Sequence, residues 1–203
     1  MKIIELVLDE ENDDAGITAI SIVENPAIEE DFIALKNQKK KITFASVDKE
    51  KRLIMGAALT PNKPIYRKAG KEEYYIFFSK DTVRKASELF FIKGNQNKAT
   101  LEHNEILDGL TVVESWIVED SKKDKTALYN MDLPEGTWVV SMRVDSDEIW
   151  NDYVKEGKVK GFSVEAYFSD KMQRPKDKTI EEQASAQELL DTIKSILSEE
   201  HEG

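Results

Sequence analysis

Short apolar segments, separated by turn-forming residues, recur along most of the chain. Their β-branched and aromatic residues favour extended backbone, because such side chains pack well on a pleated surface. Most of these segments are shorter than a typical globular helix. We therefore expect strands over residues 2–8, 17–23, 53–59, 74–78, 99–103, 110–118, 138–144 and 160–168.

Two segments follow a helical pattern instead. The spacing predicts one helix over residues 81–93, with Ser79 as its cap. It predicts a second helix over residues 146–155, where Asp145 and Glu148 resemble a capping box. The first helix places one apolar face at helical spacing, formed by Val83, Ala86, Leu89 and Phe90.

These elements predict an α+β fold, built on a mostly antiparallel sheet or small β-barrel with two or three helices. The composition shifts after Asp170, where residues 171–179 are charged and interrupted by proline, as in a linker. Residues 180–197 have the pattern of an amphipathic helix. We therefore expect a domain of residues 1–170 and a C-terminal helical tail of residues 171–203, which either docks on its own domain, binds a partner or is removed.

Composition and charge exclude several classes of protein. A net charge of −11 argues against binding to nucleic acid or to an anionic membrane surface, since both need clustered Lys and Arg. The absence of cysteine excludes disulfides, thiol catalysis and zinc–thiolate sites. No apolar run approaches the roughly 20 residues that span a bilayer, and Glu5 comes too early for a signal peptide. We expect a cytosolic protein.

Histidine is the most informative residue type. The chain has 2 histidines, and His201 lies in a terminus of the kind that is usually disordered. Histidine chemistry therefore falls to His103. A metal site of three histidines is excluded, and no metal or organic cofactor is implied. An imidazole with an ordinary pKa near about 6.5 can activate a serine hydroxyl, so His103 is a candidate general base.

The segment Gly161-Phe162-Ser163-Val164-Glu165 has half of a nucleophile-elbow motif. It carries glutamate where that motif needs its second glycine, and a strand is predicted to continue where a helix should begin. The sequence also lacks a phosphate-binding P-loop, a dinucleotide-binding Gly-x-Gly-x-x-Gly and a His-Glu-x-x-His zinc motif. An α/β-hydrolase is therefore not expected.

Five segments, taken in order, resemble a known family. They are Ala19–Ala27, residues 63–80, Ala99–Asn104, Val113–Val118 and Gly136–Glu165. Together they resemble the tailed-phage prohead (capsid-maturation) serine proteases, specifically their XkdF-like branch, over roughly residues 15–168. That family is related in fold to the herpesvirus assemblins, which are small β-barrel serine proteases. The resemblance implies an assemblin-like fold, with His103 as the general base and Ser163 as the nucleophile.

Two carboxylates are candidates for a third catalytic member. Assemblins use a second histidine in this role, for which this chain has no ordered counterpart. Glu114 is predicted to lie on a strand between apolar neighbours, and pairing with His103 would offset the cost of that position. Glu165 follows Ser163 by two residues and shares its strand face. Glu114 is the preferred candidate and Glu165 the alternative; each could also be a solvated strand residue.

The resemblance implies that the chain is a serine endopeptidase of prohead maturation. Its substrates would be the phage scaffolding protein, the major capsid protein and its own chain, inside the assembling prohead in the host cytoplasm, with self-association open. The alternative is a non-catalytic structural or scaffold-like virion protein that keeps the fold. A binding module with a free helical tail is a third interpretation.

Overall fold

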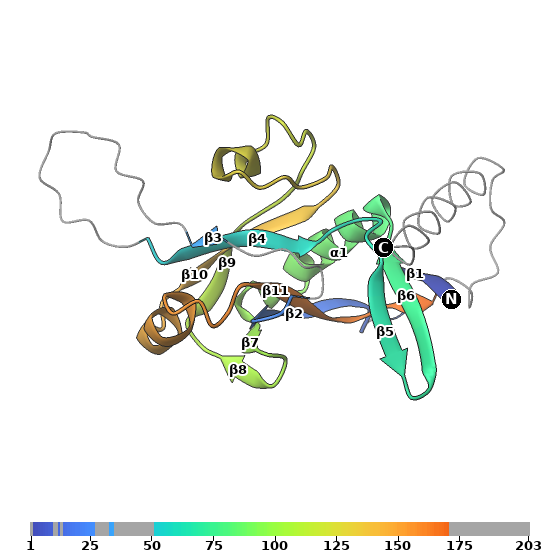
Figure 1. The fold of residues 1–203 in the computed structure, drawn as a ribbon, viewed down its shortest axis with the longest axis horizontal. Coiled ribbons are helices and arrows are strands. Elements are labelled where there is room, and N and C mark those ends of the chain that lie inside the picture. Colours follow the sequence, from blue (N-terminus) through green and yellow to red (C-terminus); the bar gives the residue numbers. More distant parts are fainter. Residues whose placement is uncertain (1, 10–11, 13, 27–32, 35–50, 171–203) are drawn as a thin grey trace, which may run out of the picture.

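The computed structural model describes residues 2–9, 12, 14–26, 33–34 and 51–170, which form three four-stranded sheets (Figure 1). The predicted tail helix lies outside the described residues. Most strand pairs are antiparallel, and the parallel pairs are β1–β6 and β2–β7. The prediction of an α+β fold with a mostly antiparallel sheet is confirmed. The alternative of a small β-barrel is not observed: in the part of the chain that the structure describes, the three sheets do not close into a barrel.

The first sheet has the order β12-β1-β6-β5. It contains β1 (Lys2–Val7), β5 (Ile65–Ala69), β6 (Glu72–Phe78) and β12 (Ser169–Asp170). β5 and β6 form a hairpin that projects from the rest of the molecule (Figure 1). Gly70, at φ +62°, lies in its tight turn, where a positive φ suits glycine.

The second sheet has the order β3-β4-β10-β9. It contains β3 (Ile33–Ala34), β4 (Leu53–Leu59), β9 (Leu110–Ile117) and β10 (Trp138–Val144). β4 and β10 are buried along nearly their whole length, which agrees with their near-continuous apolar sequences. β9 lies at an edge and is exposed in its middle.

The third sheet has the order β11-β2-β7-β8 and carries the candidate site. It contains β2 (Gly16–Val23), β7 (Ala99–Leu101), β8 (Glu105–Leu107) and β11 (Gly161–Tyr167). The central strand β2 is almost entirely buried. β11 is an edge strand of this sheet among the described residues.

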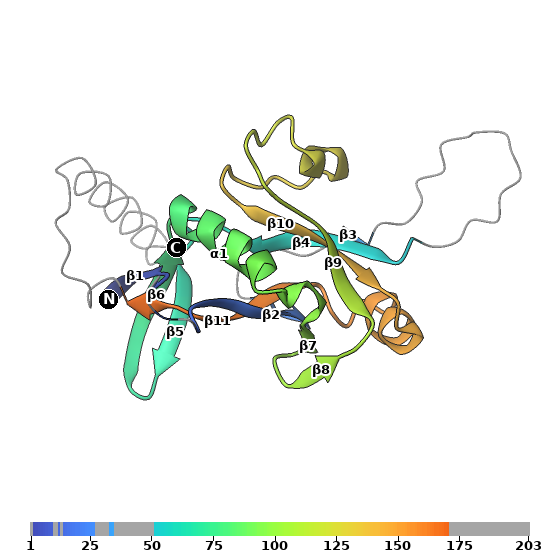
Figure 2. The same ribbon diagram turned by 180° about the vertical axis from the view of Figure 1, so that it is seen from behind.

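Helix α1 (Lys80–Ile92) packs against the sheets and runs from the end of β6 toward β7 (Figure 2). The hydroxyl of Ser79 accepts a hydrogen bond from the Thr82 N–H, as the predicted cap requires. The buried face of the helix includes Phe90, whose ring centroid lies 5.4 Å from that of Trp138. This edge-to-face contact joins the helix to the core.

The predicted second helix is present but has another form. Residues Ile149–Val154 form a π-helix. Its start is bonded to Ser146, whose hydroxyl accepts from the Ile149 N–H and whose carbonyl accepts from the Trp150 N–H. The predicted cap was wrong, because Asp145 instead accepts from the Arg143 side chain. Two short 3-10 helices, Asn95–Asn97 and Lys125–Tyr129, complete the structure.

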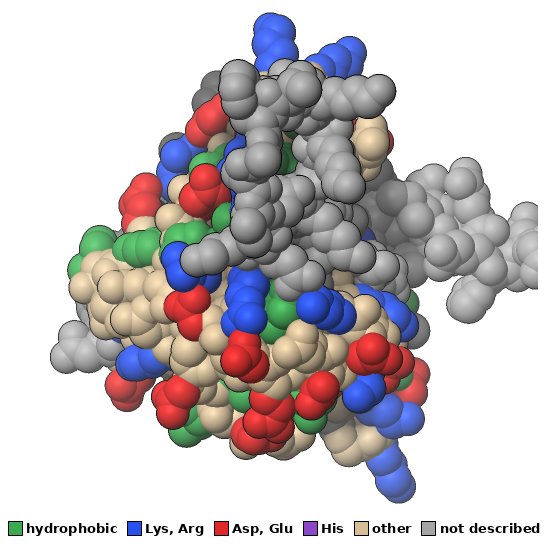
Figure 3. Space-filling view, turned by 90° about the vertical axis from the view of Figure 1, so that its left-hand side faces the viewer, with side chains coloured by type: hydrophobic (Ala, Val, Ile, Leu, Met, Phe, Trp, Pro, Cys, Tyr) green, Lys and Arg blue, Asp and Glu red, His purple; other side chains and the backbone are tan. Residues whose placement is uncertain are grey.

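Acidic and basic side chains are interspersed on the described part of the face in Figure 3. None of the helices in the described ranges is long and apolar enough to span a membrane. Within the same residues, no group of three or more His, Cys, Asp or Glu side chains could hold a metal ion.

Candidate functional site

Three hydroxyl side chains lie in one row across the third sheet. Ser163 on β11 pairs with Ser21 on β2, and Ser21 pairs with Thr100 on β7. Residues directly opposite each other on neighbouring strands point to the same face of a sheet. The row therefore connects the candidate nucleophile to the strand that leads into His103.

The two faces of β11 have different environments. Phe162 is fully buried and belongs to the core, and Val164 packs against that core. Because successive strand residues point to opposite faces, Ser163 and Glu165 share the other face. The Glu165 side chain keeps 31% of its surface exposed. At Glu165 this face of β11 is thus partly open to solvent.

His103 lies in the turn between β7 and β8, so the predicted strand ends earlier, at Leu101. Glu102 and His103 have φ values of +51° and +60°, in the left-handed region that non-glycine residues rarely adopt. The Asn104 N–H donates to the Leu101 carbonyl at 3.0 Å and closes the turn. Such backbone strain persists only where surrounding contacts hold it.

A hydroxyl from the central strand holds this turn in place. The backbone N–H of His103 donates to the Ser21 Oγ at 3.0 Å, and that hydroxyl donates to the Thr100 carbonyl at 3.3 Å. Ser21 is fully buried, so both bonds are shielded from water. Ser21 thereby connects β2, β7 and the His103 turn.

The imidazole of His103 faces Glu165. Its Nδ1 lies 3.4 Å from Oε1 of Glu165, and the Thr100 hydroxyl donates to the same oxygen. A carboxylate at Nδ1 stabilises the tautomer and the imidazolium that a general base needs, and leaves Nε2 for proton transfer. Ala19 stands opposite Glu165 on β2, and its small side chain leaves room for Glu165 to reach β7.

Glu114 does not occupy that position. Its carboxylate accepts hydrogen bonds from Lys125 at 2.5 Å and from Ser141 at 2.6 Å. The bond from Lys125, followed by that from Ser141, holds the pKa of Glu114 below its ordinary value. The structure does not bring Glu114, the preferred candidate, to His103, because β9 belongs to a different sheet. The alternative, Glu165, is the carboxylate that the fold brings to His103.

Ser163 and His103 do not contact each other in this structure. Among the described residues, the backbone N–H of His103 bonds to Ser21 and its ring contacts Glu165, and no hydrogen bond links the ring to Ser163. In unliganded enzymes such bonds are often long and tighten only when substrate binds. The geometry therefore places the base and its carboxylate together, with the serine two strands away in the same row.

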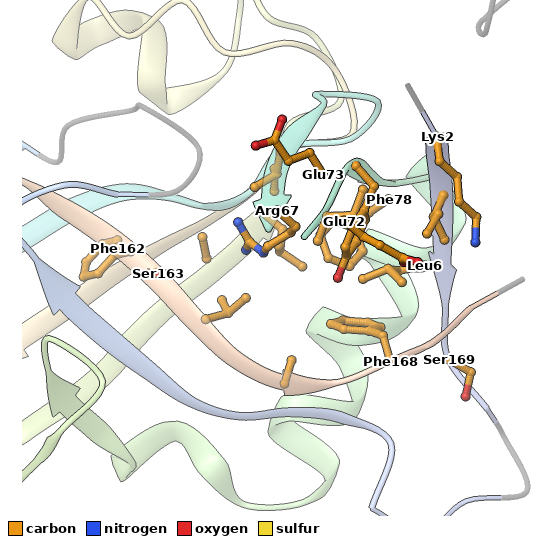
Figure 4. Close-up of a pocket in the computed structure, with 18 residues that line it drawn as sticks. Lys2, Leu6, Arg67, Glu72, Glu73, Phe78, Phe162, Ser163, Phe168 and Ser169 are labelled. Atoms are coloured by element: carbon orange, nitrogen blue, oxygen red, sulfur yellow. The ribbon is translucent and has the colours of Figure 1, made fainter. Parts of the chain in front are cut away.

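A cavity of about 1000 Å³ adjoins Ser163 between the first and third sheets (Figure 4). Its apolar wall includes Phe162, Val164 and Phe168, which point away from the face that carries Glu165. Its polar side chains include Arg67 on β5. Ser163 thus lies between an apolar cavity and the polar row of hydroxyls.

The tryptophans do not line the cavity beside Ser163. Trp138 is fully buried and Trp150 is 2% exposed, both within the core. Trp116 is partly buried and packs under the ammonium of Lys125, 5.2 Å from its ring centroid. The Trp138 Nε1–H donates to the Ser115 hydroxyl, so Ser115 has a structural role.

Sequence reasoning missed Ser21 and Thr100. Both are buried polar residues in segments of mainly apolar, β-branched composition. A polar residue inside such a segment indicates a required hydrogen bond, since buried hydroxyls are rarely left unpaired. That signal was available at Ser21, although its partner could not be known.

A family model described as "Putative phage serine protease XkdF" matches residues 40–172, which is more than half of the chain. The matched range includes His103, Glu114, Ser163 and Glu165. No match was found among curated proteins or among solved structures.

Proposed function

The chain belongs to the XkdF family of phage serine proteases, and we propose that it is a serine endopeptidase. Ser163 is the nucleophile, His103 the general base and Glu165 the carboxylate that orients the base. The observation that carries this assignment is the contact between Nδ1 of His103 and Glu165 at 3.4 Å. It is the arrangement that leaves Nε2 of the imidazole available to a serine.

The reaction would be acyl transfer from the peptide to Ser163. Ser163 Oγ attacks the carbonyl carbon of the cleaved bond while His103 Nε2 takes the hydroxyl proton. Collapse of the tetrahedral intermediate breaks the C–N bond, and His103 returns the proton to the leaving amine. Water then attacks the acyl-enzyme with the same base and releases the second product, which restores Ser163.

This mechanism requires His103 and Ser163 to approach each other when substrate binds. Two strand spacings, or about 10 Å, separate the Ser163 backbone from that of Thr100. The turn and ring of His103 must therefore move across the small side chains of the central strand to reach Ser163. A bound polypeptide that lies across β11 and β7 would favour the closed arrangement.

We propose the phage scaffolding protein and the major capsid protein as substrates, with cleavage of the chain itself as a further event. The reaction would take place inside the assembling prohead in the host cytoplasm. The partly exposed side chains of His103 and Glu165 support this, because a site that is accessible at the surface suits a protein substrate that supplies its own cover. Self-association in the crowded shell belongs to the same proposal.

The test is co-expression of the chain with its scaffolding and capsid proteins, followed by intact-mass analysis of the products over time. Wild type is compared with Ser163→Ala, His103→Ala and Glu165→Gln, and Glu114→Gln is the matched control, since it also neutralises a strand glutamate. We expect new termini in wild type and in the control only. Equal masses in all five samples while shells assemble would support a structural virion protein instead.

A further inference from the structure

One face of the first sheet forms a wall of the cavity of about 1000 Å³ that lies between this sheet and β11 (Figure 4). Paired residues on neighbouring strands point to the same face of a sheet, so the lining residues of β1, β6 and β5 stand in rows. Ile4, Ile76 and Ile65 form a buried row, and Lys2, Tyr74 and Arg67 form a row nearer the tip of the hairpin.

The cavity exposes apolar surface. Side chains that line it and pack against the core, while staying only partly buried, are Leu6, Tyr74, Val164, Ala166 and Phe168. Apolar surface gathered in one hollow is typical of a docking site. The hollow lies on the side of β11 opposite Glu165, because successive strand residues point to opposite faces. An occupant therefore leaves the candidate catalytic face uncovered.

The last described strand lies at the edge of the same sheet. β12 pairs with β1, where Asp170 stands opposite Leu6, and Ser169 itself lines the cavity. The sequence continues from there to Gly203. The charged linker of residues 171–179 spans up to about 30 Å when extended, so residues 180–197 can reach any part of the cavity.

The sequence of residues 180–197 calls for an apolar surface to pack against. It predicts an amphipathic helix whose apolar face holds Leu189, Leu190, Ile193, Ile196 and Leu197. A helix of this length is only marginally stable in water by itself. The face from residue 189 to residue 197 is about 13 Å long, and a helix about 10 Å wide over that length fills roughly the volume of the cavity.

We propose that residues 180–197 dock as a helix into this cavity of the same chain, with the apolar face of residues 189–197 against β1, β6 and β11. The short linker favours this occupant over a second copy, because such a tether holds the tail at an effective concentration of about millimolar. The inference is independent of the proposed protease activity. The docked tail lies behind β11 and leaves His103 and Glu165 accessible.

The experiment is hydrogen–deuterium exchange of the full chain, read by mass spectrometry at two protein concentrations. All samples carry Ser163→Ala, so that self-cleavage cannot remove the tail. Ile193→Asp places a charge in the apolar face of the predicted helix. Ser195→Asp is its matched control, because it places the same residue on the opposite side of that helix.

The cavity side has a matched pair on a single strand. Tyr74 lines the cavity, whereas the ring of Tyr75 contacts that of Tyr66 on the other face of the hairpin. Tyr74→Asp therefore tests the cavity and Tyr75→Asp is its control. Slow exchange in β10, which belongs to another sheet, shows that a variant is folded. If Tyr74→Asp is not folded, the tail variants decide the question.

The parent chain should protect the amides of residues 186–197 about 10- to 100-fold relative to a synthetic peptide of residues 171–203. Ile193→Asp and Tyr74→Asp should abolish this protection, and Ile193→Asp should also speed exchange in β1 and β6. The two controls should retain it.

Three results overturn the inference. Exchange of the tail at the peptide's rate in the parent chain shows a free tail, available to another protein. Protection that falls on dilution, together with a dimer mass in light scattering, assigns the cavity to the tail of a second copy. Equal loss in Tyr75→Asp and Tyr74→Asp, with both folded, shows that the tail contacts a different surface.

Discussion

The buried hydroxyl of Ser21 accepts the backbone N–H of His103 at 3.0 Å. This bond attaches the strained turn between β7 and β8 to β2, a central strand of the sheet. It explains how two consecutive non-glycine residues remain in the left-handed region. Ser21 therefore positions the backbone of His103.

Ser21→Ala should lower both stability and activity. Loss of the bond frees the turn and leaves the His103 N–H unpaired, which should cost about 1–2 kcal/mol of unfolding free energy. We expect kcat/KM to fall about 10-fold with KM nearly unchanged, measured on a peptide substrate beside denaturant unfolding.

Ser115→Ala is the control for that variant. It removes a hydroxyl that accepts from Trp138 at 2.8 Å, in another sheet. We expect a similar loss of stability with activity preserved. If the two variants lose activity equally, Ser21 has only a general structural role.

Glu165→Gln should reduce kcat by about 100-fold or more, because the amide cannot stabilise the imidazolium that forms during the reaction. Glu114→Gln should change kcat less than about 3-fold, since its carboxylate binds Lys125 and Ser141. Labelling of Ser163 by a fluorophosphonate probe provides an independent measurement. The assignment of the orienting carboxylate would be reversed if Glu114→Gln were the slower variant.

The Glu114–Lys125 pair should stabilise the fold in a pH-dependent way. The pKa of Glu114 is lower in the folded chain than its ordinary value of 4.5. Its contribution is therefore complete well above pH 4.5 and is lost as the pH falls through the folded pKa. Because 45% of the Glu114 side chain is exposed, solvent screening limits the contribution to about 0.5 kcal/mol.

The measurement compares unfolding free energies of wild type and Glu114→Gln at pH 7 and pH 3. The difference should be present at pH 7 and decrease as the pH is lowered toward 3. A difference of the same size at both pH values would show that the variant acts by changing packing.

Gly136→Ala should destabilise the domain by about 2 kcal/mol or more. Gly136 has φ +88°, and an added Cβ would lie 2.8 Å from Cγ of Lys80 and 3.2 Å from Cγ of Pro61. Gly70→Ala is the control, because Gly70 has φ +62° and nothing within 4 Å of an added Cβ. It carries only the backbone strain, about 1 kcal/mol. Equal losses in thermal unfolding would show that the clash at Gly136 relaxes at no cost.

The positions of most strands and of α1 follow from the sequence. The apolar residues of β4 and β10 and the helical spacing of Val83, Ala86 and Phe90 are local patterns, and local patterns suffice to predict such elements. β5 was missed because its residues Arg67 and Lys68 are charged. It exists because β6 supplies hydrogen-bond partners, which no local pattern reveals.

The sequence alone also singled out His103 and Ser163 as candidates, through the scarcity of histidine and the resemblance of ordered segments. It favoured Glu114 over Glu165, because the local pattern of a strand does not show which other strand lies beside it. Only strand order decides: β9 enters one sheet with β10, while β11 lies across β2 from β7. Strand order depends on contacts between residues distant in the chain, so only the tertiary structure placed Glu165 and Ser21 beside His103.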